Sequence, residues 1–163
     1  MKQIDSKILD DLSAQAAASQ RKRANHNLHK GVEDPVQRLC IAIEPGTYIR
    51  PNRHADPETM EVFLLLRGSA VVLLFDDAGR VTERVQLSAR GPVYAVEIPP
   101  KAWHAMASLE KGTVFFEVKQ GPYAAPKGVN VAAWAPEEGK PEAMKFEAWY
   151  RQAKAGDMPP DIL

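Results

Sequence analysis

The chain has 163 residues, of which 45% are hydrophobic, and this is enough apolar material for one domain with a sizeable core. Its 21 basic and 21 acidic side chains give a formal net charge of zero, and the basic residues are spread along the chain except at 21–23. This balance argues against a nucleic-acid-binding surface and against a polybasic membrane anchor.

The sequence predicts a cytoplasmic protein without a membrane partner. The single cysteine, Cys40, excludes an internal disulfide framework and suits a reducing compartment. The first residues are polar with no apolar segment behind them, and no later apolar run is long enough to span a bilayer.

The first 37 residues predict a helix followed by a connector. Apolar residues recur at helical spacing from Ile4 to Leu12, and Asp5 or Ser6 can cap the free amides, so we expect a helix that ends near residue 19. Residues 21–31 have no apolar period, and their composition favours a solvated basic connector.

Residues 38–120 predict a small antiparallel barrel. Leu39, Ile41 and Ile43 alternate with more polar or smaller residues, as in a strand that is buried on one face. Short strands separated by turns at regular spacing are typical of a barrel or jelly roll. We expect strands near 38–44, 62–66, 70–75, 81–87, 93–98 and 113–119.

Residues 121–163 predict a strap and a final helix. The strap is rich in Pro, Ala and Gly, and Tyr123 and Trp134 are expected to anchor it. A helix is expected to begin near Pro141, to run past Tyr150 and to end before Gly156. The three segments, 1–37, 38–120 and 121–163, then make one domain.

Two histidines and a carboxylate are candidates for a metal site. The strands of a barrel can bring His54, Glu61 and His104 together, and this set of side chains suits a divalent ion. An inward-facing Glu61 would need a cation or a hydrogen-bonding partner. The alternatives are ordinary core or surface histidines, a strand-edge charge at Glu61, and Glu58 in place of Glu61.

The spacing of these residues resembles both halves of the cupin signature. Five residues separate Gly46 from Asn52, His54 completes the Asn-x-His pair, and six residues separate Glu61 from Gly68. The second half is matched by residues 99–104, which end at the second candidate histidine. Among the two acidic candidates, only Glu61 has the spacing to Gly68 that the signature requires.

The chain more narrowly resembles the WbuC family of cupin-fold metalloproteins, within the RmlC-like cupin superfamily. The matching segments are residues 23–29, 34–39, 121–123 and 133–136. The resemblance implies a mainly β protein: a cupin jelly-roll β-barrel with an N-terminal helix and a short C-terminal helix. It also implies a divalent metal ion (Zn, Fe, Ni or Mn), a small sugar-like ligand and a role in O-antigen polysaccharide biosynthesis.

Three residues depart from the cupin pattern. Asn52 stands where the first histidine is usual, Glu61 comes late, and Lys101 replaces a glycine. An amide oxygen is a weaker ligand than an imidazole for Zn, Fe or Ni, so Asn52 shifts the preference of the site towards harder ions. Asn52 could ligate the metal, hold a ligand water, or cap the turn after Pro51.

Five further residues are candidates for binding or catalysis. His26 and His29 could supply an acid or base if their segment forms a flap over the metal, and Tyr48 could act in a sugar pocket. Arg38 and Arg50 are candidate substrate contacts, because a guanidinium binds carboxylate or phosphate in a bidentate manner. For each arginine, and for Tyr48, an exposed strand position is an equally good interpretation.

These expectations leave three functions open. A metal held by two histidines and a carboxylate suits sugar isomerisation or epimerisation, and the same ligands holding iron suit a dioxygenase. A non-catalytic sugar-binding or regulatory cupin with a degenerate metal site is the alternative. We also expect a homodimer, because the edges of a jelly roll need to be covered.

Overall fold

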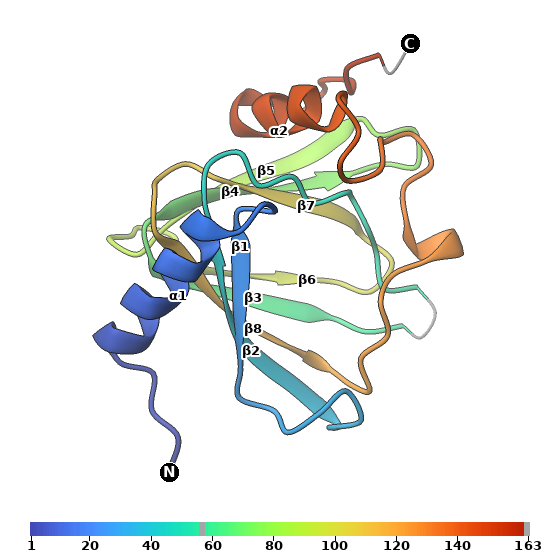
Figure 1. Ribbon diagram of the computed structural model, residues 1–163. Coiled ribbons are helices and arrows are strands. Elements are labelled where there is room, and N and C mark those ends of the chain that lie inside the picture. The colour runs from blue at the N-terminus through green and yellow to red at the C-terminus, as the bar shows by residue number, and fades with distance from the viewer. Residues whose placement is uncertain (56–57, 162–163) are drawn as a thin grey trace.

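Two antiparallel sheets face each other and enclose the core (Figure 1). The computed structural model describes residues 1–55 and 58–161. One sheet has the strand order β1-β2-β8-β3-β6, and the other has the order β5-β4-β7. The strands are β1 (Arg23–Asn27), β2 (Val36–Ile43), β3 (Glu61–Arg67), β4 (Ser69–Phe75), β5 (Val81–Ser88), β6 (Ala95–Ile98), β7 (Trp103–Ser108) and β8 (Thr113–Gln120). The predicted mainly β class is confirmed.

The alternation in β2 separates the inside of the barrel from its outside. Ile41 and Ile43 belong to the core between the sheets, together with Phe115 of the neighbouring strand β8. Cys40 and Ala42, at the intervening positions, face the other way and pack beneath the N-terminal helix. This is the distribution that strand periodicity predicts.

A helix covers the outer face of each sheet (Figure 1). Helix α1 (Ser6–Ala18) begins at Asp5, whose carboxylate accepts a hydrogen bond from the Ile8 amide, and it packs on β2 and β8 through Leu12. Helix α2 (Ala143–Gln152) places Phe146 and Tyr150 on β4 and β7, and a short 3₁₀ helix (Gly128–Asn130) lies in the strap before it. In the described residues, no helix combines the length and apolar character that crossing a membrane requires.

Two expectations about secondary structure are wrong. Residues 23–27 form strand β1 instead of a connector, because their backbone pairs with β2 from Arg23 opposite Ile43 to Asn27 opposite Leu39. Polar side chains did not prevent this pairing, since a backbone ladder at a sheet edge does not depend on them. Strand β7 was not predicted at all. It is buried along its whole length, so it lacks the alternation of a half-exposed strand, and its small and polar residues lack the continuous apolar run that marks the buried strand β4.

The segment between β2 and β3 contains no strand in its described part, yet it is fixed to the sheets. Within the described part of this segment, Asn52 forms isolated bridges to His104 and to Val131. Its amide donates to the His104 carbonyl at 3.1 Å, and the His104 amide donates to its carbonyl at 3.0 Å. This pair of hydrogen bonds fixes the segment against β7.

Gly68 forms the turn between β3 and β4, and this turn packs closely against Thr113 of β8. A substitution at Gly68 therefore tests the packing of the turn. The φ of Gly68 is +78°, and an added Cβ would lie 2.5 Å from Thr113 Oγ1. We predict that Gly68→Ala lowers the free energy of unfolding by at least about 2 kcal/mol, because it adds left-handed strain to a steric clash. Chemical denaturation measures this change.

The matched control is Gly31→Ala, since an added Cβ there meets nothing within 4 Å. We expect its stability to stay within about 1 kcal/mol of the wild type. Equal destabilisation by both substitutions would contradict the described packing of the β3–β4 turn.

Candidate metal centre

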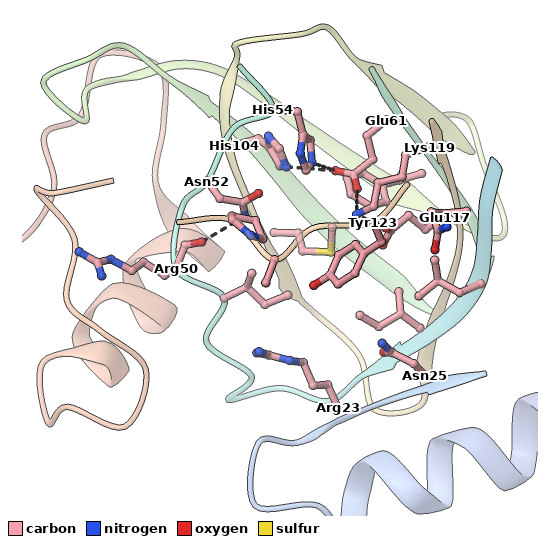
Figure 2. A pocket seen from close by; sticks show the side chains of 18 of the residues that line it. Arg23, Asn25, Arg50, Asn52, His54, Glu61, His104, Glu117, Lys119 and Tyr123 are labelled. Atoms are coloured by element: carbon pink, nitrogen blue, oxygen red, sulfur yellow. Dashed lines mark hydrogen bonds and ion pairs between the residues drawn. The ribbon is translucent and has the colours of Figure 1, made fainter. Parts of the chain in front are cut away.

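The structure brings together the three residues that the sequence proposed as metal ligands. His54, Glu61 and His104 each offer one ligand atom, and these atoms all lie within 4.8 Å of one another. The Oε2 atom of Glu61 lies 3.2 Å from His104 Nε2 and 3.5 Å from His54 Nε2 (Figure 2). All three side chains lie at one wall of a cavity.

Each candidate ligand comes from a different part of the fold. Glu61 is the first residue of β3 and is paired with Ile98 of β6 and Lys119 of β8. His104 lies on β7, in the opposite sheet. His54 follows the bridge residue Asn52, and its carbonyl accepts a hydrogen bond from the Lys101 amide at 3.1 Å. The site therefore depends on both sheets being in place.

Contacts at His104 and beside His54 restrain the two histidines of the site. His104 Nδ1 lies 3.0 Å from the Ala102 carbonyl, and donation of its proton to that oxygen leaves Nε2 free to accept a metal. Beside His54, the Arg53 guanidinium lies 4.2 Å above the Trp103 ring and binds the Val129 carbonyl at 2.9 Å. These contacts hold the segment against β7 and the strap.

Glu61 is almost completely buried and is paired with a lysine. Its Oε1 atom lies 2.8 Å from Lys119 Nζ, and the same ammonium lies 2.8 Å from Glu117 Oε1. Burial alone would raise the pKa of Glu61, but hydrogen bonds with His104 and His54 and the charge of Lys119 hold it well below its usual value. Glu61 is therefore an ionised carboxylate.

Burial outweighs the opposing charge at Glu117, whereas at Lys119, as at Glu61, the neighbouring charges outweigh burial. Burial and the neighbouring charge of Glu61 raise the pKa of Glu117 to about 7, although Lys119 opposes the change. Burial would lower the pKa of Lys119, but the charges of Glu61 and Glu117 raise it above its usual value. Lys119 is thus a mostly buried ammonium at the edge of the site, held in its charged form by the two carboxylates.

The donor set fits a divalent ion. Two donors that each lie about 2.1 Å from one ion at tetrahedral or octahedral angles are roughly 3.0–3.4 Å apart, close to the separations between Glu61 and the two histidines. Glu58, the competing carboxylate, is exposed and pairs with Lys101 instead. Asn52 lines the same cavity, and its Nδ2 donates to the Arg50 carbonyl at 3.3 Å.

The cavity has a volume of about 710 Å³, which is ample for a small organic ligand. Part of its lining is apolar and comes from the barrel interior: Leu39, Ile41, Phe63 and Met106. A polar part comes from alternate residues of β1: Arg23, Asn25 and Asn27. The metal-binding candidates and the β1 residues thus face one space (Figure 2).

Only some of the other candidate residues line this cavity. His29 and Arg50 do so, although Figure 2 shows the Arg50 side chain extending away from the histidine pair. Arg50 Nε donates to the Ala132 carbonyl at 3.1 Å, so this arginine holds the strap. The Arg38 amide donates to His29 Nδ1 at 3.0 Å, which places the imidazole at the end of the cavity formed by β1 and β2.

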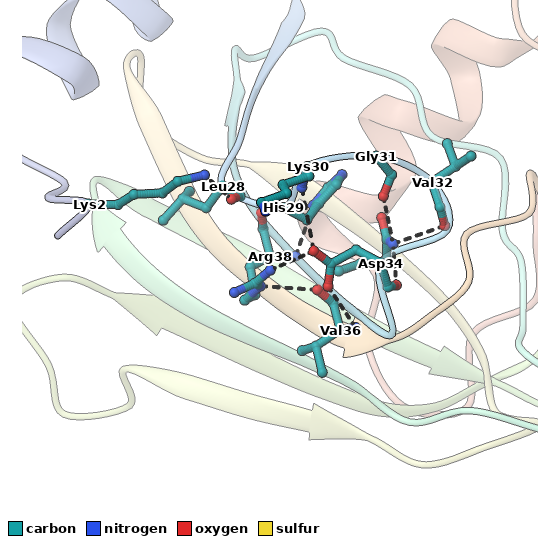
Figure 3. A network of polar contacts seen from close by, with 10 residues as sticks. Lys2, Leu28, His29, Lys30, Gly31, Val32, Asp34, Val36 and Arg38 are labelled. Atoms are coloured by element: carbon teal, nitrogen blue, oxygen red, sulfur yellow. Dashed lines mark hydrogen bonds and ion pairs between the residues drawn. The ribbon is translucent and has the colours of Figure 1, made fainter.

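Three candidates lie outside the cavity lining. Tyr48 is buried against α2 and donates from its hydroxyl to the Pro136 carbonyl at 2.8 Å, and burial raises its pKa. Arg38 turns back to Asp34 at 2.9 Å and to the Val36 carbonyl (Figure 3). His26 is exposed and, unlike its neighbours Asn25 and Asn27, does not line the cavity. These positions suit structural roles.

Lys119 and the inner face of β1 were not predicted from the sequence. Lys119 was assigned to a strand without a role, although Phe115, Glu117 and Lys119 share one face at a period of two residues. Two charged residues that continue an inward-facing row are a signal for a buried polar site. Arg23, Asn25 and Asn27 also recur at a period of two residues, which is typical of a strand with one polar face. The basic composition of the segment favoured a connector instead.

Similar solved structures establish the cupin fold. A cupin superfamily protein from Desulfitobacterium hafniense is 17% identical, with a TM-score of 0.50, over 67% of this chain and 86% of its own. The protein TT1209 from Thermus thermophilus is 20% identical, with a TM-score of 0.52, over 74% of this chain and 98% of its own. An oxalate oxidase bound to glycolate is 17% identical, with a TM-score of 0.51, over 67% of this chain and 56% of its own.

Sequence comparison gives a family as well as a fold. No curated protein matches the chain. A family model described as "Domain of unknown function (DUF6016)" matches residues 4–87, which include helix α1, strands β1–β4, all of β5 but its last residue, and two of the three candidate ligands. Because this match covers more than half of the 163 residues, the chain belongs to the DUF6016 family.

Proposed function

We propose that this protein is a divalent-metal-binding cupin that binds or transforms a small carbohydrate-type ligand. The observation that carries the proposal is the convergence of His54, Glu61 and His104 at the wall of a cavity large enough for such a ligand. Two imidazoles and one carboxylate fill three coordination positions, and further positions remain for ligand oxygens.

The chemistry at this site is Lewis-acid chemistry. A bound divalent ion would polarise a carbonyl or hydroxyl group of the ligand, as isomerisation or epimerisation of a sugar requires. The chain itself supplies orientation: the Ala102 carbonyl fixes the tautomer of His104, and Lys119 fixes the rotamer of Glu61. The ion is Zn, Fe, Ni or Mn, and with Fe the same set of ligands would serve a dioxygenase.

The polar face of β1 supports a ligand rich in hydroxyl groups. Asn25 and Asn27 line the cavity, and among residues 1–55 and 58–161 their side chains have no hydrogen-bond partner. An amide side chain both donates and accepts, so it matches a hydroxyl group. Arg23, on the same face, is held by Glu138 and by the Tyr48 carbonyl at 2.8 Å.

The segment that contains β1 is also part of the resemblance to WbuC proteins. We therefore include in the proposal a WbuC-type role in the biosynthesis of an O-antigen-like polysaccharide, in the cytoplasm. Residues 23–29 support it, because the structure brings part of this segment into the cavity. His29 remains our candidate acid or base in this segment.

A non-catalytic sugar-binding cupin is the second candidate function. The observation that favours it is Lys119, whose ammonium already neutralises the buried Glu61 carboxylate without a metal. Ligand binding would then be insensitive to chelators and to His104→Ala. In a metal-dependent protein, both a chelator and His104→Ala would weaken ligand binding.

Metal content tests the leading proposal. We predict near-stoichiometric divalent metal in the purified protein by elemental analysis, and at least a tenfold loss of affinity in His54→Ala and in His104→Ala, because each removes one of about three protein ligands. His26→Ala is the control, since it removes an exposed imidazole from the opposite side of β1. Absence of metal after reloading, or equal loss in all three variants, would contradict the proposal.

A second prediction separates the two glutamates. Glu61→Gln should abolish stoichiometric metal binding, because a neutral amide replaces the anionic ligand oxygen, whereas Glu58→Gln should bind as the wild type does. The two substitutions are chemically the same, and Glu58 is exposed and paired with Lys101. Isothermal titration with Zn²⁺ or Mn²⁺ measures both, and a weaker affinity only in Glu58→Gln would reverse the assignment.

We further propose that the protein is a homodimer. Strand β1 lies at one end of the five-stranded sheet, so one of its edges has no neighbour in that sheet. Light scattering at micromolar concentration should give twice the 18.0 kDa mass of the chain. A measured mass equal to that of a single chain would contradict the proposed dimer.

A further inference from the structure

Lys119 lies between two buried carboxylates, of which one is a candidate metal ligand (Figure 2). Its ammonium is 2.8 Å from Glu61 Oε1 and 2.8 Å from Glu117 Oε1, and its side chain is 13% exposed. The Tyr123 ring lies 5.3 Å from the same nitrogen. Both carboxylates and the lysine line the cavity beside the two histidines.

The two oxygens of Glu61 are used differently. Oε1 is bound by Lys119, whereas Oε2 faces the Nε2 atoms of His54 and His104. A carboxylate that is free on both oxygens can bind one ion through both of them. With Oε1 engaged by an ammonium, Glu61 offers one oxygen only.

Glu117 is the second carboxylate that Lys119 binds, and it lies outside the group of candidate ligands although it lines the same cavity. It is buried at 7% exposure on the same inward row of β8 as Lys119. A buried carboxylate without a partner moves towards the nearest cation, because its desolvation is otherwise uncompensated. In this structure the ammonium of Lys119 is that cation.

We propose that Lys119 is a positioning residue that keeps the metal coordinatively open. It holds Glu61 in one-oxygen binding and Glu117 away from the ion, so that the remaining positions are available to the ligand. This inference rests on the proposed function, because it requires a metal at His54, Glu61 and His104. It assigns Lys119 a task that a simple structural ion pair would not have.

The test uses the full chain loaded with Co²⁺, whose visible absorption weakens as its coordination number rises. Azide is the probe of open positions, since it changes that spectrum only where it can bind the ion. We predict an intense spectrum that responds to azide in the wild type. In Lys119→Met we expect a weaker spectrum, at least a tenfold weaker azide response and at least a tenfold higher Co²⁺ affinity, because a repelling charge is lost and carboxylate oxygens are gained.

Two variants serve as controls. Lys119→Arg keeps the charge and the hydrogen bonds, and it should retain most of the azide response. Lys7→Met removes a lysine that is paired with Asp11 on the surface of α1, and it should behave as the wild type. Should Lys119→Met fail to fold, as thermal melting would show, Lys119→Gln removes the charge while keeping a donor for one carboxylate, and the same changes are expected.

The outcomes separate this inference from the function on which it rests. A wild type that binds no Co²⁺ contradicts the metal site itself and overturns both. A wild type that binds Co²⁺ but does not respond to azide overturns the inference alone. The inference alone is also overturned if an uncharged variant at position 119 keeps the spectrum and the azide response of the wild type. Lys119 would then only form a structural ion pair.

Discussion

The buried charge of Glu61 is the constraint on which the rest of the site depends. An ionised carboxylate that is 3% exposed is strongly unfavourable unless cations or hydrogen-bond donors surround it. Lys119 compensates one of its oxygens, and the two histidines face the other. The second oxygen is the one that a divalent ion would take. The site is therefore organised around one carboxylate whose two oxygens have separate partners.

The barrel makes this arrangement possible by packing one region of its interior and leaving another hollow. Phe115 and Leu65 fill the packed core, whereas the cavity lies where inward positions of β3, β7 and β8 carry Glu61, His104 and Lys119. Helices α1 and α2 cover the outer faces of the two sheets, which leaves the interior for the ligand (Figure 1). Strand β1 then contributes polar groups from the sheet edge.

Local patterns predicted the elements that carry an apolar period or, as in β4, a continuous apolar run, and failed where neither was present. Helix α1 and the alternation of β2 followed from apolar spacing, and the choice of Glu61 over Glu58 followed from a motif. Strand β7 was missed because it has neither alternating faces nor the continuous apolar run of β4, and β1 because its partner, not its own composition, makes it a strand. The roles of Tyr48, which packs on α2, and of Lys119 depend on residues far away in sequence.

Anomalous diffraction from a crystal of the protein grown with Zn²⁺ or Mn²⁺ tests the central claim most directly. The account predicts one strong peak within about 2.0–2.3 Å of His54, Glu61 Oε2 and His104, with Lys119 still bound to Glu61 Oε1. A fully occupied ion elsewhere, or a crystal in which Lys119 is the only cation beside Glu61, would contradict it. In either case the cavity would bind its ligand without a metal at these three residues.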